Sequence, residues 1–209
     1  MQYALGLAVM AIGVVLMIRV QFGSAPITSV PTAISGITPF TIGNMTILVH
    51  ALCIIGQAII VRRITLKCLL TALVGVPFGY IIDLFMFLFA PDYLSPILRI
   101  VLLFVGLACS GFGVRLVVGS DLMLPAPDEL SHTISQVYCK KLSNVKIVSD
   151  AIYVAIAASV DLLSSGKLSS VGIGTVLSVL FVGKFVGWFT KLFPALTMEP
   201  FWPGKRCPK

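Results

Sequence analysis

Long apolar blocks separated by short polar stretches dominate the sequence. A helix rises 1.5 Å per residue, so about 20 apolar residues are needed to cross the hydrocarbon core of a bilayer. Six blocks have about this length, and each predicts one membrane-spanning helix: residues 3–22, 44–61, 68–90, 98–119, 147–163 and 171–193. The fifth block is the shortest and begins beside Asp150.

Composition agrees with a membrane protein. Hydrophobic residues make up 58% of the 209 residues and charged residues 11%, whereas a soluble domain carries about 25% charged residues. The net charge of +7 does not indicate nucleic-acid binding, because the basic residues cluster at the ends of apolar blocks. The 5 cysteines contain no Cys-x-x-Cys pair, so their spacing predicts neither a disulfide framework nor a metal site.

Lysine and arginine are distributed unequally between the two sides of the predicted helices. One side keeps little beyond Arg99 and Lys167. The other side, with both termini, holds Arg62, Arg63, Lys67, Lys140, Lys141, Lys146, Lys191, Lys205, Arg206 and Lys209. Because short cytoplasmic loops are enriched in lysine and arginine, we predict that both termini are cytoplasmic.

The chain resembles itself when it is shifted by 100 positions. Residues 6–61 then align with residues 106–161, and a shift of 108 continues the match. The matched pairs include Gly6 with Gly106, Gly13 with Gly113, Asn44 with Asn144, Gly75 with Gly183 and Gly79 with Gly187. Shared apolar composition explains matches between leucines and valines, but not glycines and an asparagine in one register. We therefore predict an internal duplication.

The duplication predicts the architecture. We expect an all-α membrane protein with a single domain, 1–209, in which repeat 1 covers about 3–92 and repeat 2 about 98–193. A cytoplasmic tail, 194–209, follows. Each repeat holds three spans, an odd number, so the second enters from the opposite face as a 3+3 inverted repeat. Such repeats are typical of secondary transporters, whose substrate sites lie near the bilayer midplane.

A proline-punctuated segment follows the first span of each repeat. Pro26 and Pro127 can each open a short helix, because proline is tolerated in the first helical turn. One interpretation is a pair of re-entrant or half-length helices that dip toward the centre from opposite faces, with their positive ends toward a shared cavity. The alternative is a pair of ordinary surface loops. In the first case the residues along the path are Ser24, Pro26, Thr28, Ser29, Pro127, Asp128, Glu129, Ser131 and His132.

Ionisable residues within spans are candidates for function. We expect Lys184 to face a cavity or a partner and to bind substrate. Arg19 and Arg115 either snorkel to the headgroups or offer positive charge beside the broken segments.

Three further residues are candidates for coupling or gating, together with Arg115: His50, Asp83 and Asp150. A histidine can carry a coupling proton, although a buried, hydrogen-bonded histidine is an equal alternative for His50. For Asp83, the alternative is a structural role as a helix cap or at the membrane interface.

Short motifs over about residues 5–193 carry a resemblance to a known group. They are Gly23–Pro26, Pro125–Leu130, Gly75 with Gly79 and Asp83, Lys146 with Asp150, and Gly172–Thr175. The chain resembles the YitT/YczE group of small bacterial inner-membrane proteins, with Gly-x-x-Pro matched by the first motif. Pro-x-Asp is matched with a different spacing, which makes Asp128 the corresponding acid. The resemblance implies a polytopic fold with duplicated halves in a bacterial inner (plasma) membrane, and implies little about substrate.

Together these patterns favour a secondary transporter of a small polar metabolite, anions included, that binds between the two broken segments. A non-transporting accessory or scaffold protein and a channel are the alternatives. We expect no enzymatic activity and no cofactor, because the acids and histidines do not form a catalytic or metal-ligand pattern. The expected partners are a small-molecule substrate and the lipid bilayer, without nucleic acid. The sequence allows a monomer as well as a homodimer.

Overall fold

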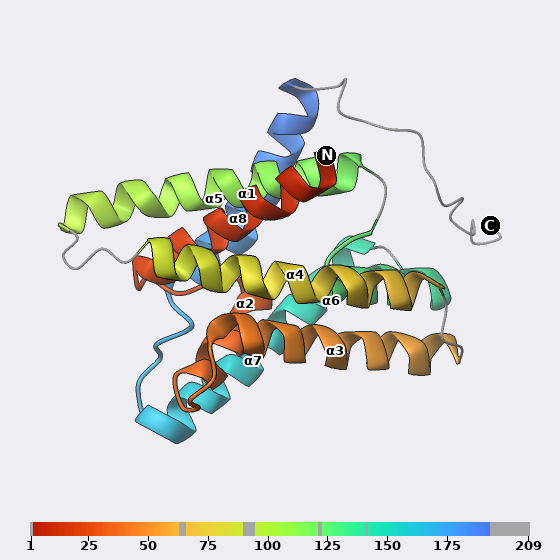
Figure 1. The fold of residues 1–209 in the computed structure, drawn as a ribbon, viewed down its shortest axis with the longest axis horizontal. Helices are drawn as coiled ribbons and strands as arrows, with labels where there is room; N and C mark the ends of the chain where they lie inside the picture. Colours follow the sequence, from red (N-terminus) through yellow and green to blue (C-terminus); the bar gives the residue numbers. More distant parts are fainter. Residues whose placement is uncertain (1, 63–65, 90–94, 121–122, 141, 193–209) are drawn as a thin grey trace.

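The computed structural model describes residues 2–62, 66–89, 95–120, 123–140 and 142–192. These residues form eight helices: α1 Gln2–Arg19, α2 Pro26–Ser35, α3 Ile42–Val61, α4 Leu66–Leu88, α5 Pro96–Gly119, α6 Ala126–Val137, α7 Leu142–Ser165 and α8 Ile173–Leu192 (Figure 1). The predicted tail, 194–209, lies outside the described residues, as do Arg63 and Lys141 of the charge pattern.

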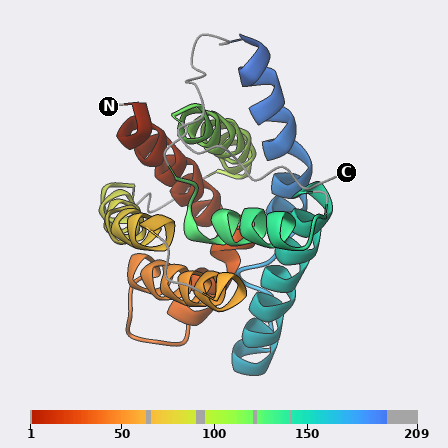
Figure 2. The same ribbon diagram turned by 90° about the vertical axis from the view of Figure 1, so that its right-hand side faces the viewer.

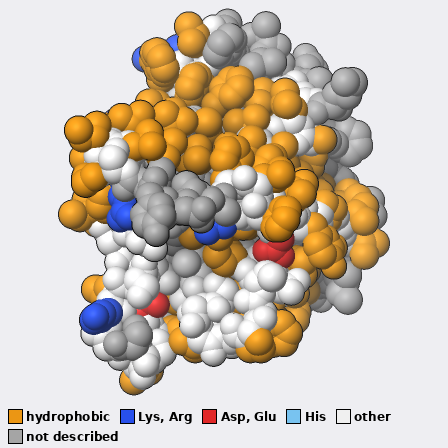
Figure 3. Space-filling model, turned by 60° about the vertical axis from the view of Figure 1, so that its left-hand side comes forward, with side chains coloured by type: hydrophobic (Ala, Val, Ile, Leu, Met, Phe, Trp, Pro, Cys, Tyr) orange, Lys and Arg blue, Asp and Glu red, His pale blue; other side chains and the backbone are white. Residues whose placement is uncertain are grey.

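Five of the helices are long and apolar enough to cross a membrane: α1, α3, α4, α5 and α7. The sixth predicted span is also helical, and its apolar part, Ile173–Phe189, is shorter. Large hydrophobic side chains on these helices are widely exposed, including Phe87 at 83% and Leu163 at 88%. Figure 3 shows such side chains as a broad hydrophobic band on one face. These features are consistent with a multi-pass membrane protein.

The predicted boundaries differ most in the fifth block. The structure begins α7 at Leu142, five residues before the predicted start, so Lys146 belongs to the helix. The polar first turn of α7 hides the helical pattern from an argument based on apolar runs alone. The two proline-punctuated segments form the short helices α2 and α6.

Four helices, α1, α3, α4 and α5, run along the long axis of the molecule, and α7 and α8 cross them (Figures 1 and 2). α1 and α5 are antiparallel neighbours, because Gly6 lies against Leu116 while Gly13 lies against Gly106. A Cβ atom on Gly13 would stand 2.5 Å from the backbone nitrogen of Ser110. Small residues therefore allow this close crossing, as is usual between membrane helices.

Close contact between α3 and α4 also depends on glycine. A Cβ atom on Gly43 would stand 2.2 Å from the carbonyl oxygen of Gly79. Asp83 of α4 caps the start of α3, because its carboxylate accepts hydrogen bonds from Thr41 Oγ1 at 2.6 Å and from the Gly43 N–H at 2.8 Å. The cap satisfies the Gly43 N–H, which has no partner within the helix.

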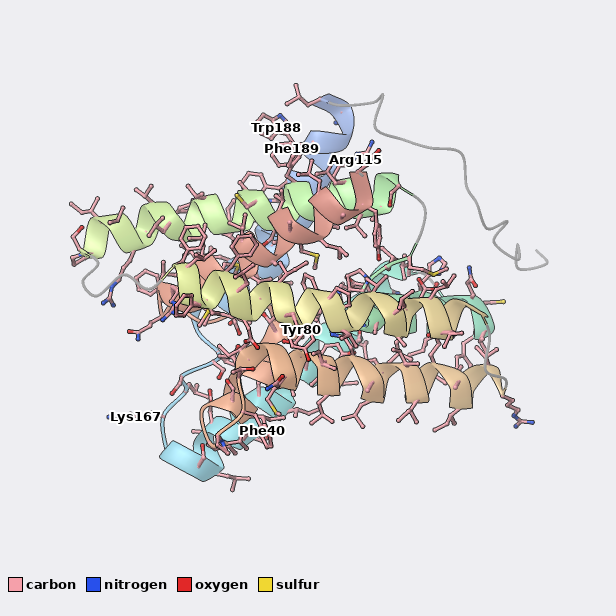
Figure 4. The ribbon with its side chains drawn as sticks, viewed as in Figure 1. Phe40, Tyr80, Arg115, Lys167, Trp188 and Phe189 are labelled. Carbon is pink, nitrogen blue, oxygen red and sulfur yellow. The ribbon has the colours of Figure 1, made fainter. Side chains whose placement is uncertain are left out.

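In the predicted second repeat, α7 and α8 correspond to α3 and α4, but these two helices diverge. α8 packs on α5 instead, with ring centroids 6.2 Å apart for Phe104 and Phe181 and 5.1 Å apart for Phe112 and Phe189. Figure 4 shows Phe189 far from Lys167, which follows α7. The spacing of Gly183 and Gly187 predicts a tight helix crossing, and this prediction is wrong: among the described residues, no atom lies within 4 Å of a Cβ built on either glycine.

Candidate functional site

Both short helices have a proline in their first turn, and the starts of both helices face one cavity. The residue before α2, Ala25, is extended, and Pro26 starts the helix without a side-chain cap. α6 starts in the same way after Pro125, with Pro127 in its first turn. Ala25, Pro26, Pro125 and Pro127 all line the cavity. The positive ends of two helix dipoles therefore meet at one hollow.

The cavity has a volume of about 540 Å³, which is in the usual range for small-molecule sites. All eight helices contribute to its wall. Most of the wall is apolar and includes Met10, Val14 and Phe78, together with Val179 and Val182 of α8.

An ion cluster forms the polar part of the wall. The Lys146 ammonium contacts Asp128 Oδ1 of α6 and lies 3.1 Å from Asp150 Oδ1, one turn farther along α7. Asp150 and Lys146 are four residues apart and hence share one helix face. All three side chains line the cavity and are largely removed from solvent. Because α7 packs against α6, the cluster joins these two helices at the cavity.

His50 of α3 faces the same cavity and is fixed by its neighbours. Its Nδ1 lies 2.8 Å from the carbonyl oxygen of Thr46, and its ring meets Phe78 edge to face at 5.9 Å. The tautomer that carries hydrogen on Nδ1 donates this bond, because a carbonyl oxygen only accepts. Gly75 makes room for the ring, since a Cβ there would stand 3.3 Å from His50 Cβ.

Hydroxyl groups complete the wall. Ser131 and Ser149 share a hydrogen bond at 2.8 Å, and Ser178 donates to the Thr175 carbonyl oxygen at 2.7 Å. Ser110 of α5 lines the cavity, is only 5% exposed and has no hydrogen-bond partner within the described part of the chain. A buried hydroxyl without a partner is costly, so the Ser110 hydroxyl is suited to bind a ligand or a water molecule.

The turn before α2 docks on the connection between α7 and α8. Gly174 N–H donates to the Phe22 carbonyl oxygen at 2.6 Å, and Ser24 N–H and Oγ donate to the Ser170 carbonyl oxygen at 2.9 and 3.1 Å. Asp161 holds this connection in turn by accepting from the Ser169 and Ser170 N–H groups at 2.9 and 2.7 Å. This tie positions Pro26 at the cavity, and sequence reasoning missed it.

Gly23 makes this docking possible. Its φ of +99° is a conformation that only glycine adopts readily, and a Cβ there would stand 2.4 Å from Gly172 N. We expect Gly23→Ala to lower the free energy of unfolding by about 2–4 kcal/mol, from backbone strain plus overpacking. Thermal unfolding of the detergent-purified protein measures the loss.

The matched control is Gly166→Ala. Gly166 also has a positive φ, +65°, but no described atom lies within 4 Å of its Cβ position. Its loss is therefore limited to backbone strain, about 1–2 kcal/mol. Equal losses at the two positions would contradict the close approach of Gly23 to Gly172.

The structure brings together seven of the residues that the sequence singles out. Pro26, Thr28, Pro127, Asp128, Ser131, His50 and Asp150 all line the cavity. They come from two parts of the chain that are far apart in sequence, α2 with α3 and α6 with α7.

Several other candidates face elsewhere. Lys184 does not line the cavity: it is exposed on α8, with its ammonium 5.3 Å from the Phe181 ring centroid, while Gly183 and Val186 occupy the cavity face of that helix. Asp83 lies outside the wall and caps α3, which is its structural alternative.

Ser24 and Ser29 also lie outside the wall, because their hydroxyl groups bond to backbone carbonyls of Ser170 and Pro26. Glu129 and Arg115 are buried but do not line the cavity. Glu129 Oε1 lies 4.0 Å from His132 Nδ1 on the same helix.

Other residues of the wall did not follow from the sequence argument as site residues: Thr46, Phe78, Ser110, Lys146 and Ser178. The charge pattern of the sequence places Lys146 among the cytoplasmic basic residues. Its spacing of four residues from Asp150, on an apolar helix, was the one signal that indicated a paired charge.

Comparisons with known proteins place the chain without assigning an activity. The model of a family described as "Family of unknown function (DUF6198)" matches residues 1–191. A Bacillus subtilis (strain 168) protein named "Uncharacterized protein YyaS" is 24% identical over 192 residues, which cover 90% of each chain. No solved structure matches the chain. The resemblance to the YitT/YczE group is not named by these matches and stays a prediction.

Proposed function

We propose that this chain, which belongs to the DUF6198 family of unknown function, is a secondary transporter that carries a small polar solute through the cavity between α2 and α6. The observation that carries the proposal is that the two proline-opened helices begin at one cavity with an ion cluster in its wall. Irregular backbone and paired charges within a membrane domain are tolerated where they line a cavity, and they mark solute pathways.

The antiparallel crossing of α1 and α5 supports the inverted-repeat part of the proposal. Gly13 and Gly113 occupy matching positions of the predicted repeat, and both lie at this crossing. An odd number of spans per half inverts the second half relative to the first, and its first helix then runs antiparallel to the first helix of the chain. Bacterial inner membrane is the location that we propose, with both termini cytoplasmic.

Unequal packing of the two halves supports alternating access. α3 and α4 are in close contact through Gly43 and Gly79, whereas α7 and α8 diverge at Gly183 and Gly187. In an inverted repeat, each half can adopt the conformation that the other has. We propose that transport exchanges these roles: α8 closes on α7 through its glycines while α4 separates from α3.

Reconstitution tests the proposal. A thermal-shift screen of the purified protein against small metabolites identifies ligands, since binding to the native form at a hundredfold excess over Kd stabilises it by roughly 2.7 kcal/mol. Counterflow of each ligand is then measured in proteoliposomes. Absence of both a stabilising ligand and saturable flux would contradict the transporter and favour the accessory-protein alternative, while linear, uncoupled flux would favour a channel.

A bulky side chain in the wall should block the path. Val179 of α8 is half exposed at the cavity, so we expect Val179→Trp to fill space without disturbing the core and to lower flux at least about tenfold, or about 1.4 kcal/mol. Leu180→Trp is the control, because Leu180 is equally exposed on the next position of α8 and does not line the cavity. Flux that is reduced equally in both variants would argue against this route.

A further inference from the structure

The ionisable side chains of the cavity wall carry a net negative charge. They are Asp128, Asp150, Lys146 and His50, so with a neutral histidine the two carboxylates and one ammonium sum to −1. The two carboxylates lie beside the positive ends of α2 and α6, which reduce this charge but offer no carboxylate-like partner to a cation. The other cations that the sequence singles out lie outside the wall among the described residues: Lys184 is exposed over Phe181, Arg19 donates to the Met86 carbonyl oxygen, and Arg115 is buried. A wall of this sign attracts cations and repels anions, most strongly away from bulk water.

Lys146 occupies the position that a bound cation would take. Its ammonium stands between the two carboxylates, in contact with Asp128 and 3.1 Å from Asp150. The lysine side chain is still 35% exposed, at the end of a flexible four-carbon stem. It can therefore withdraw and release both carboxylates to a ligand of the same charge without a change in helix packing.

The rest of the wall suits an apolar body. Met10, Val14 and Val114 line it, and Phe78 offers an aromatic ring of the kind that attracts ammonium groups. The buried Ser110 hydroxyl, which has no partner among the described residues, is an independent sign that something polar binds in the cavity. An anion would meet the two carboxylates in this space, and a highly hydrated solute would lose its water to valine and methionine.

We propose that the cavity binds a small organic cation, an amine or quaternary ammonium on an apolar body, whose charged group displaces the Lys146 ammonium from Asp128 and Asp150. The proposal rests on the proposed function in that it names the solute class of the same cavity. It narrows the expectation that anions are included, because two carboxylates line the wall, whereas Arg19, Arg115 and Lys184 do not.

Calorimetric titration of the purified full chain tests the selectivity. The probes are benzyltrimethylammonium, benzoate and benzyl alcohol, which share a ring and differ in charge. We expect the cation to bind at least about tenfold more tightly than either of the others, a difference of about 1.4 kcal/mol. Titration into protein-free detergent micelles removes the contribution of micelle adsorption.

Variants of the ion cluster should shift cation affinity in opposite directions. Asp150→Asn weakens binding of benzyltrimethylammonium about tenfold, because one attracting charge is lost. Lys146→Gln strengthens it about tenfold, because the internal competitor is removed. If the ion cluster had only a structural role, both variants would weaken binding of the cation. Lys140→Gln is the matched control: Lys140 is exposed after the end of α6 and does not line the cavity.

The outcomes separate the two proposals. Preference for benzoate, or equal affinity for all three probes, would overturn the cation site whether or not the variants fold. Neither result would contradict the proposal that the protein is a transporter. Binding of the cation without saturable flux in proteoliposomes would overturn the transporter and leave the cation site standing. If Lys146→Gln does not fold, Lys146→Arg keeps the internal charge, and its cation affinity must not exceed that of the wild type.

Discussion

Replacing Asp128 with asparagine lowers uptake of the ligand found by thermal-shift screening at least about 100-fold, while the protein stays folded in the membrane. Asp128 lines the cavity at the start of α6 and contacts the Lys146 ammonium. Asparagine keeps the shape of the side chain but removes its charge, and loss of one partner of a partly buried charge pair costs about 2–5 kcal/mol. The measurement is initial uptake into proteoliposomes, normalised to protein that elutes as one species.

The neighbouring acid provides the contrast. Glu129 follows Asp128 in sequence but does not line the cavity. We therefore expect Glu129→Gln to lower the yield of folded protein and to leave uptake per folded molecule within about threefold of the wild type, which is less than 1 kcal/mol. Equal loss of specific uptake in both variants would mean that the charge of the whole α6 start, rather than Asp128, matters for transport.

Leucine at two matching glycines gives opposite results. Gly79→Leu strongly destabilises the protein, because a Cβ at Gly79 already stands 2.5 Å from Ile47 and 2.7 Å from the Gly43 carbonyl oxygen. We expect it to lower the free energy of unfolding by about 3 kcal/mol or more, as overpacking of a close contact does. Gly187→Leu leaves the thermal unfolding temperature unchanged, because no described atom lies within 4 Å of its Cβ position.

Transport separates these two variants further. If α8 must close on α7 during each cycle, Gly187→Leu binds ligand normally but loses flux at least about 100-fold, since leucine blocks the closed contact without disturbing the open one. Ligand affinity from thermal shift and counterflow in proteoliposomes are compared for the same preparation. Normal flux in Gly187→Leu would rule out closure of α7 and α8 through this glycine.

Local sequence patterns were sufficient for the helices. Runs of apolar residues predicted the spans to within a few residues, and Pro26 and Pro127 correctly predicted two short helices, because a proline without an N–H is accommodated in the first turn. The prediction was weakest at Lys146, where a polar first turn placed the start of α7 too late. The backbone hydrogen bonds of a helix join residues four positions apart, so the local sequence largely determines where a helix forms.

The cavity wall required the tertiary structure. Lys146, from α7, meets Asp128, from α6, while Lys184 turns away from the cavity although it lies deep in an apolar helix. Which side of a helix faces a cavity depends on how the helix is rotated against its neighbours, and this rotation follows from contacts between distant segments, such as Gly13 with Ser110 or Ser24 with Ser170. The sequence by itself determined a helical membrane protein with two proline-opened helices. Only the packing of those helices decided which charged side chains share one cavity, and hence that their sum is negative.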